Sequence, residues 1–241
     1  MRYGIFSDIH ANLEALESVA EALKQKDIDF YWCPGDIVGY GANPKECIEL
    51  VKELKAVSVA GNHDWAVLGK IDLQYFNPIA KAAVLWTQDR VSVEETKFLT
   101  RLPLVFHDEE IMMVHATLPR PEDFGYLIKM ATAQEMFPLL ARNICFIGHT
   151  HVPFIIKNRQ GELKVEETLK IKTEAGCQYI VNVGSVGQPR DGNPNAAYCI
   201  FDSDSRTIAI ERVEYDLPKA QKKIIEAGLP SVLADRLSVG R

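Results

Sequence analysis

The sequence has little of what secreted or membrane proteins use. Its five cysteines are odd in number and form no C-x-x-C pair, and most lie in apolar runs, which indicates reduced core thiols rather than a disulfide framework. No charged and apolar leader precedes the first strand-like residues. No apolar run reaches the ~18 residues that a membrane span needs. We therefore expect a cytoplasmic protein with no membrane partner.

An excess of basic residues is also missing. The formal net charge is −6, which argues against long nucleic acid as a partner. The 241 residues, of which 47% are hydrophobic and 25% charged, are enough for a substantial core. We expect one domain over residues 1–241. The sequence leaves the oligomeric state open, with a homo-oligomer among the alternatives.

Histidine is scarce as well, but its placement is informative. The chain has six histidines, and five of them lie in short polar stretches that follow apolar, strand-like runs. A fifth stretch of the same kind, Gly35-Asp36, contains an aspartate and no histidine. The complete set is Asp8-x-His10, Gly35-Asp36, Gly61-Asn62-His63-Asp64, His115 and Gly148-His149-Thr150-His151. Side chains two positions apart on a strand share one face, so each D-x-H or H-x-H pair can reach one ion. Carboxylate, imidazole and amide ligands at several strand ends suit hydrolytic metal ions.

Hydrophobic periodicity predicts alternating strands and helices in the first half of the chain. The expected strands are 3–7, 28–33, 57–60, 111–114 and 144–147, and the expected helices are 12–26 and four others that begin near residues 43, 77, 92 and 132. After residue 151 the pattern predicts strands at 154–157, 163–171, 179–183, 197–201 and 208–213, then a helix at 218–227. A mostly parallel half followed by an antiparallel half suggests two packed sheets with helices outside.

Taken one at a time, these residues have more than one explanation. A carboxylate can bridge two cations through its two oxygens, so Asp36 is a candidate shared ligand, although Gly-Asp is also common in turns. His63 follows Asn62 in what reads as a tight turn, so it is expected to stand over the substrate as a proton donor rather than bind the same ion. His107 lies in a polar turn at residues 106–109 and is predicted to be exposed and not a ligand.

Together the stretches resemble the calcineurin-like metallophosphoesterase superfamily in order, spacing and strand context over residues 5–151. Residues 182–190 resemble its small bacterial and archaeal phosphodiesterase branch. The resemblance implies an α/β fold, a four-layer α/β/β/α sandwich of two mixed β-sheets flanked by helices. It also implies two metal ions, with Asp8, His10 and His151 on the first, Asp36 bridging, and Asn62, His115 and His149 on the second.

The implied activity is hydrolysis of a small phosphate ester by a metal-bridging hydroxide, with His63 as the general acid. Manganese is the expected metal, and iron, nickel, cobalt and zinc are alternatives. A phosphodiester is favoured, because the sequence lacks the extra basic residues that a dianionic monoester rewards. A broad phosphomonoesterase and a non-catalytic metal-binding scaffold are the alternatives, and the presence of His63 favours an enzyme.

The sequence departs from the protein phosphatases of that superfamily at two positions. Gly39 and Tyr40 stand where those enzymes have an acidic residue and an arginine, which argues against protein phosphatase activity. His63 is thereby left without an obvious carboxylate partner, and Asp64 is a candidate whose direction in the turn is open. Arg190 is the candidate for a phosphate contact through its guanidinium, alongside the amide of Asn62.

Overall fold

Twelve strands form two six-stranded mixed sheets in the computed structural model, which describes residues 1–241. Sheet A has the order β3-β2-β1-β11-β12-β9, and sheet B has the order β4-β5-β6-β10-β7-β8. The strands are β1 (Arg2–Ile5), β2 (Phe30–Cys33), β3 (Val57–Ser58), β4 (Val105–His107), β5 (Met112–Val114), β6 (Ile144–Ile147), β7 (Phe154–Arg159), β8 (Glu162–Val165), β9 (Lys170–Lys172), β10 (Gln178–Asn182), β11 (Ala196–Asp202) and β12 (Thr207–Val213).

Eight α-helices and three short 3₁₀ turns connect or cover the strands. The helices are α1 (Leu13–Lys24), α2 (Pro44–Glu53), α3 (Asn62–Val67), α4 (Pro78–Gln88), α5 (Val93–Thr100), α6 (Met130–Met136), α7 (Leu217–Glu226) and α8 (Ser231–Val239). The 3₁₀ turns are η1 (Leu73–Tyr75), η2 (Pro121–Asp123) and η3 (Phe137–Leu139). None of the helices combines the length and the apolar character that crossing a membrane requires.

Each sheet takes strands from both halves of the chain. In sheet A, the parallel strands β1, β2 and β3 continue into antiparallel β11, β12 and β9. In sheet B, β6 pairs in parallel with β5 and with β10, and β7 and β8 extend the sheet antiparallel. The predicted fold class of two mixed sheets is confirmed. The mostly parallel first half and the antiparallel second half are also confirmed by the pairings within each half. The two halves do not form separate sheets, because late strands complete both.

Side chains of alternate strand residues fill two different cores, as the two-residue period of a strand requires. From β6, Ile144 and Phe146 point into the space between the sheets, where they join Tyr179 and Val181 of β10. Cys145 of the same strand lies on the opposite face, in the cluster that also contains residues of α6. The core between the sheets is therefore apolar and continuous, and it fixes one sheet against the other.

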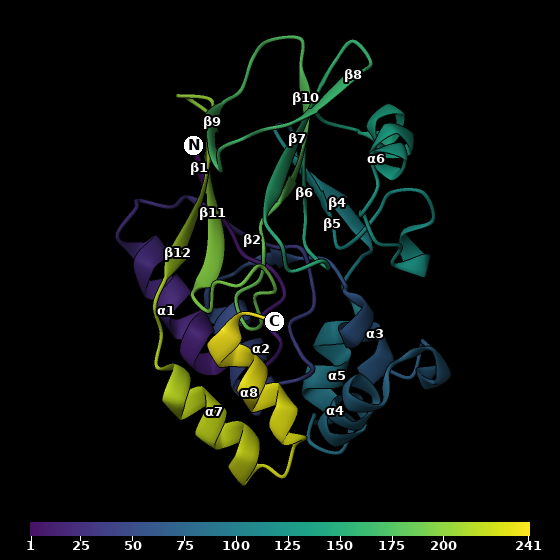
Figure 1. Ribbon diagram of the computed structural model, residues 1–241, viewed down its shortest axis with the longest axis vertical. Coiled ribbons are helices and arrows are strands. Elements are labelled where there is room, and N and C mark those ends of the chain that lie inside the picture. The colour runs from purple at the N-terminus through teal and green to yellow at the C-terminus, as the bar shows by residue number, and fades with distance from the viewer.

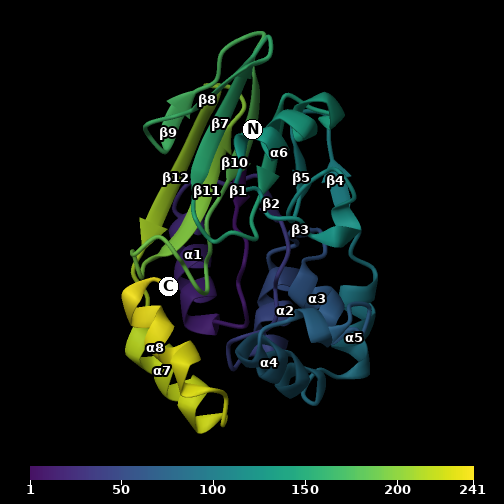
Figure 2. The ribbon, with the colours of Figure 1, turned by 45° about the vertical axis from the view of Figure 1, so that its right-hand side comes forward.

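Helices cover the outer faces of both sheets. Residues of α1 and α2 pack on sheet A, and α6 packs on sheet B, which gives the four layers that the sequence predicts. A further cluster joins α4 to α7 and α8. Figure 1 shows the sheets in the upper part of the molecule and α7 and α8, in yellow, in the lower part. Figure 2 shows α7 and α8 on one side of this lower part and α3, α4 and α5 on the other.

Several predicted elements are wrong in detail. The strand expected at 163–171 is two strands in different sheets, because β8 pairs with β7 while β9 pairs with β12. Helix α8 has no counterpart among the predicted elements, and it begins at Ser231, directly after Pro230. Helix α6 begins at Met130, two residues before the expected position. His107 is exposed as predicted, but it ends strand β4 rather than lying in a turn.

We expect Phe146→Ala to lower the free energy of unfolding by about 3–5 kcal/mol, because the ring is fully buried between the sheets. Its centroid lies 6.2 Å from that of Phe201 in the other sheet. Ile225→Ala, on the exposed side of α7, is the matched control and should change stability by less than about 0.5 kcal/mol. Urea denaturation followed by circular dichroism measures both, and equal effects would contradict this view of the core.

Candidate metal centre

The carboxyl ends of parallel strands in both sheets deliver polar side chains to one place. Asp8 and His10 follow β1, Asp36 follows β2, Asn62 and His63 begin α3 after β3, His115 follows β5, and His149 and His151 follow β6. All of them are buried except Asn62, which is partly exposed. The structure thus brings together eight of the nine site residues that the sequence predicts. The ninth, Arg190, lies at the edge, as described below.

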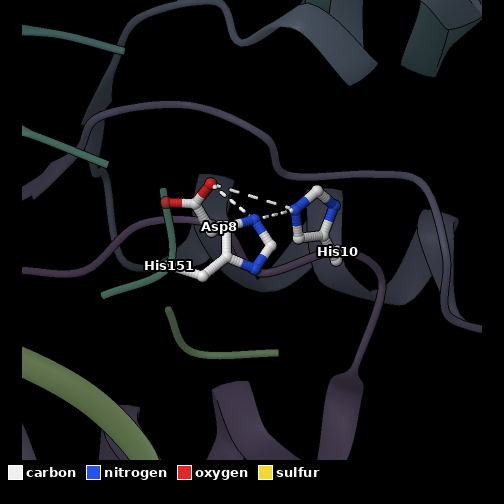
Figure 3. Close-up of side chains that lie close together, drawn as sticks. All are labelled: Asp8, His10 and His151. Carbon is white, nitrogen blue, oxygen red and sulfur yellow. Dashed lines mark hydrogen bonds and ion pairs between the residues drawn. The ribbon is translucent and has the colours of Figure 1, made fainter. Parts of the chain in front are cut away.

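The first group of donor atoms comes from Asp8, His10 and His151, whose side chains point toward one another (Figure 3). The Nε2 atoms of His10 and His151 are 3.0 Å apart. Asp8 Oδ1 lies 3.2 Å from Nε2 of His151 and 3.9 Å from Nε2 of His10. Three donors from two loops that are far apart in the sequence therefore surround one point.

The second group surrounds Nε2 of His115. This atom lies 3.2 Å from Asn62 Oδ1, 3.2 Å from His149 Nδ1 and 3.3 Å from Asp36 Oδ2. The same Asp36 oxygen is 3.6 Å from Nε2 of His10 in the first group. Asp36 therefore stands between the two groups and is within reach of both.

Backbone carbonyls fix the proton positions of three of the rings. Nδ1 of His10 contacts Val38 O at 3.2 Å, and Nδ1 of His115 contacts Pro34 O at 2.7 Å. Nδ1 of His151 contacts Gln188 O at 2.6 Å. A carbonyl oxygen only accepts, so each Nδ1 carries a hydrogen, and each Nε2 presents a lone pair to the centre when the ring is neutral. This is the usual arrangement around histidine ligands of metals.

The donor set fits divalent cations. Two imidazole lone pairs that face each other at 3.0 Å, as in His10 and His151, repel unless a positive charge lies between them. Around a metal with bonds of ~2.1 Å, neighbouring ligand atoms are about 3.0–3.4 Å apart, close to the distances found here. Nε2 of His149 is buried without a hydrogen-bond partner, while its Nδ1 faces the second group. These residues could hold the metal of the site.

The charges around the site are set by burial and by their neighbours. Burial raises the pKa of Asp8 and of Asp36, but the nearby imidazoles lower it further, so both carboxyl groups stay ionised. Burial lowers the pKa of His149 to about 3 and that of His10 well below its usual value. Burial also lowers the pKa of His115, but the charge of Asp36 outweighs it and raises the value to about 9. The donors are thus ionised carboxylates and mostly neutral imidazoles.

Close backbone approaches hold the donors in place. The amide of His149 donates to both carboxylate oxygens of Asp8, at 3.1 and 3.0 Å. A Cβ at Gly148 would lie 2.2 Å from Asp8 Oδ2, so only glycine lets the two loops meet this closely. Gly148 therefore allows the Asp8 carboxylate to lie against the backbone of the loop after β6.

His63 lies beside both groups and is held by rings rather than by a carboxylate. Its ring centroid is 4.4 Å from that of Tyr40, 4.9 Å from that of His10 and 5.3 Å from that of Phe76. Its Nδ1 is buried without a partner. A Cβ at Gly39 would lie 2.5 Å from this Nδ1, so a side chain at position 39 would reach the ring directly. Glycine at position 39, where the protein phosphatases have an acidic residue, therefore leaves the His63 ring without a side-chain partner there.

Asp64 does not replace that partner. Its carboxylate accepts hydrogen bonds from the backbone amides of Asp36, Ile37, Val38 and Gly61, at 2.9–3.2 Å. The idea that Asp64 serves His63 is wrong. Asp64 instead ties the loop after β2 to the start of α3, since buried amide groups need acceptors. It thereby positions Asp36, which also receives the amide hydrogen of His63 at 2.8 Å.

Arg190 reaches the site through Tyr40. Its Nη2 donates to Gln188 Oε1 at 2.9 Å and approaches the hydroxyl of Tyr40 at 3.5 Å. Its guanidinium lies 5.7 Å from the centroid of the Tyr40 ring, and its Nε is buried with no acceptor. The guanidinium is thus fixed at the edge of the centre with one donor free.

Sequence reasoning missed the aromatic residues around the centre. The ring of Tyr126 stacks on that of His149, with centroids 4.0 Å apart and planes 29° apart. Tyr126 belongs to an irregular stretch after η2, so no periodic pattern marks it. An aromatic residue next to glycine in such a stretch, here Gly125-Tyr126, is the only local signal that could have pointed to it. Tyr40 stood out in the sequence only as a replacement of an expected arginine.

Comparison with known proteins places the chain in a family. A sequence model of the calcineurin-like phosphoesterase superfamily domain matches residues 1–206. The chain is 44% identical over 241 residues to the uncharacterized protein MJ0912 of Methanocaldococcus jannaschii, covering 98% of this chain and 97% of that protein. It is 24% identical over 216 residues to the phosphodiesterase YfcE of Escherichia coli, covering 85% and 89%. A crystal structure of a metallophosphoesterase from Sphaerobacter thermophilus superposes with a TM-score of 0.88 at 40% identity, covering 100% of this chain and 99% of that one.

The chain therefore belongs to the calcineurin-like phosphoesterase superfamily. It is a metal-dependent hydrolase that acts on small phosphate esters, as this membership and the donor groups above indicate. The family resemblance read from the five polar stretches is confirmed, and so is the predicted class of enzyme.

We expect metal binding at pH 7.5 to release about one proton per chain, because His115, with its pKa near 9, is protonated before the metal binds. The apparent affinity should therefore rise with pH up to about 9 and then level off. Titration calorimetry in two buffers of different ionisation enthalpy measures the released proton. Binding without proton release at pH 7.5 would contradict the charge state described here.

Proposed function

We propose that this chain hydrolyses small phosphodiesters at a centre of two divalent cations that share Asp36. The observation that carries the proposal is the position of Asp36 Oδ2, 3.6 Å from Nε2 of His10 and 3.3 Å from Nε2 of His115. A carboxylate oxygen has more than one lone pair, so Oδ2 of Asp36 can serve a cation on each side. One cation for each donor group also gives every inward-facing nitrogen a partner.

Each proposed cation has its own donors. Those of the first are Asp8, His10 and His151, those of the second are Asn62, His115 and His149, and Asp36 is common to both. Nitrogen and oxygen donors in this mixture suit manganese, iron, cobalt, nickel and zinc, and manganese is the metal we expect. When bound, two such ions would clamp the phosphate oxygens and lower the pKa of a water molecule.

His63 is the proposed general acid. In the hydrolysis, the water oxygen forms a bond to phosphorus, the bond from phosphorus to the leaving oxygen breaks, and His63 gives its proton to that oxygen. Burial lowers the pKa of His63 to about 4, so the ring is neutral in the free protein at pH 7. The negative charge of a bound phosphodiester raises this pKa, because it favours the imidazolium form. His63 acts as an acid only in its imidazolium form, so it must be protonated at the step at which the leaving oxygen departs.

Two observations favour a diester over a monoester. Arg190 is the single guanidinium at the edge of the centre, and its free Nε can donate to one phosphate oxygen alongside the amide of Asn62. The related protein YfcE is named a phosphodiesterase. A dianionic monoester would gain most from additional cationic side chains, and the sequence near the centre offers none beside Arg190.

The C-terminal helices are proposed to be part of one domain that spans residues 1–241. Lys219 and Lys223 of α7 approach Glu14 of α1 at 3.2 and 2.6 Å, which links the last part of the chain to the first helix. All five cysteines are free and buried, and this supports the proposal of a reducing, cytoplasmic setting.

After loading with Mn²⁺ and removal of free metal, we expect about two ions per chain, because the centre offers two donor groups. Asp36→Asn should reduce the metal content of both sites, since the substitution replaces a charged carboxylate by a neutral amide. His107→Ala, which removes an exposed histidine that belongs to no donor group, is the matched control and should keep both ions. Elemental analysis measures the content, and one ion or none in the unmutated protein would contradict a dinuclear centre.

His63→Ala should reduce kcat for a diester with an alkyl leaving group on the order of 10²–10⁴-fold, because the leaving oxygen then lacks a proton donor. The loss should be smaller for a nitrophenyl diester, whose leaving group departs without a proton. Metal content should stay the same, which separates an acid from a ligand, and His107→Ala should keep full turnover. Equal kcat values for the variant and the unmutated protein on the alkyl ester would refute the role. Metal binding with no turnover of any ester would favour a scaffold.

A further inference from the structure

A cavity of about 400 Å³ opens beside the second donor group. Asn62, His63 and His149 form the part of its lining that belongs to the centre. The rest comes from the segment around η1 and from the segment after η2. This volume is within the ~300–1,000 Å³ range of small-molecule sites in proteins. The cavity, called the side pocket below, is large enough for one ring system attached to a sugar.

Aromatic rings dominate the two sides of the side pocket. Tyr75 and Phe76 line it from the segment at η1, and Phe124 and Tyr126 line it from the segment after η2. Phe124 is 6% exposed and fixed, whereas Tyr75 and Tyr126 are 80% and 52% exposed. Flat rings held on both sides of a gap suit a flat ligand, because aromatic groups prefer stacked or edge-to-face contacts. Exposed tyrosines that no core requires are also typical of surfaces that bind such ligands.

The charge of the side pocket selects against anionic groups. None of its 13 lining residues is a lysine or an arginine, and two are acidic, Glu122 and Asp123. Asp123 is paired with Arg120 at 2.9 Å, so Glu122 carries the charge that is not neutralised. A polyphosphate chain or a carboxylate would be repelled here. A neutral ring that carries an amino group would be accepted, since a carboxylate accepts hydrogen bonds from it.

The position of His63 decides which part of the substrate enters the side pocket. His63 lines this pocket and is the proposed acid for the leaving oxygen. The alcohol that leaves must therefore lie on the side-pocket side of phosphorus, within hydrogen-bond reach of the His63 ring. Arg190, the proposed phosphate contact, does not line the pocket.

We propose that the side pocket binds the base of a nucleoside, and that this nucleoside is the leaving alcohol of the phosphodiester. The inference rests on the proposed function and names its substrate class. Stacking on aromatic side chains accepts any base because every base has a flat face, and Glu122 favours bases with an exocyclic amine, such as adenine. A water molecule gives up one proton to the solvent and its oxygen forms a bond to phosphorus, the bond from phosphorus to the nucleoside oxygen breaks, and the proton from His63 completes the nucleoside hydroxyl. The products are the nucleoside and a phosphate monoester.

The closing experiment compares two diesters on the Mn²⁺-loaded protein. One is the methyl ester of adenosine 5′-phosphate, and the other is the methyl ester of ribose 5-phosphate, which lacks the base. We expect kcat/KM to be about 10-fold or more higher with the base, in line with base stacking on aromatic side chains. The products should be adenosine and methyl phosphate. Equal kcat/KM values, or the release of methanol and adenosine 5′-phosphate, would overturn the inference.

A binding measurement tests the side pocket without catalysis. Equilibrium dialysis of the metal-free protein should show that adenosine binds and that ribose does not. Tyr75→Leu should weaken adenosine binding several-fold and lower the kcat/KM ratio between the two esters, because that wall loses one of its two rings. Tyr75 is 80% exposed, so the variant is expected to fold. Leu139→Ala, an exposed apolar residue outside the side pocket, is the matched control and should change neither value.

The possible failures are distinct from each other. If the protein hydrolyses neither ester and also leaves bis(nitrophenyl) phosphate intact, the proposed function is wrong. If kcat/KM is the same for the ribose ester and the adenosine ester, and adenosine binds no better than ribose, only the nucleoside inference is wrong. Unchanged adenosine binding by Tyr75→Leu would also contradict the assigned pocket.

Discussion

Two buried carboxylates, Asp8 and Asp36, impose the constraint on which the rest of the structure depends. Their side chains are 0% and 2% exposed, and an unpaired buried anion carries a large desolvation cost. Nε2 atoms of His10, His115 and His151 lie 3.2–3.9 Å from the carboxylate oxygens. In their neutral form these rings add lone pairs rather than charge, because the carbonyls fix their hydrogens on Nδ1. Cations between carboxylates and rings would resolve both problems, and the proposed catalytic clamp would follow from the same arrangement.

The two sheets matter because they hold loops that would not take this shape alone. The backbone is left-handed at Asp8, His10, Asp36, His149 and His151, with φ between 49° and 68°. Such conformations cost about 1–3 kcal/mol each for residues with side chains. Hydrogen bonds between the loops offset the strain, for example from Asp8 N to Gly35 O at 3.0 Å and from Gly187 N to Asp8 O at 2.9 Å. The strained residues are thus concentrated where the donors must converge. Packing of the apolar core between the sheets holds the strands from which these loops extend.

The sequence alone predicts which polar side chains converge, since the motifs that carry them are local. A polar pair after an apolar run marks the end of a strand, and carboxyl ends of parallel strands share an edge, so residues as distant as Asp8 and His151 can be expected to meet. Periodicity does not report which sheet a strand joins, so the split between β8 and β9 was not predictable. The direction of Asp64 depends on amides of another loop, and the stacking of Tyr126 depends on an irregular segment. Both are tertiary facts with no local signal.

The central claim is that one carboxylate, Asp36, is shared by two cations. A crystal structure of the Mn²⁺-loaded protein, with data collected at the manganese absorption edge, tests it most directly. We predict two anomalous peaks about 3.5–4 Å apart, with Asp36 in contact with both. A single peak, or two peaks of which only one touches Asp36, would contradict the account.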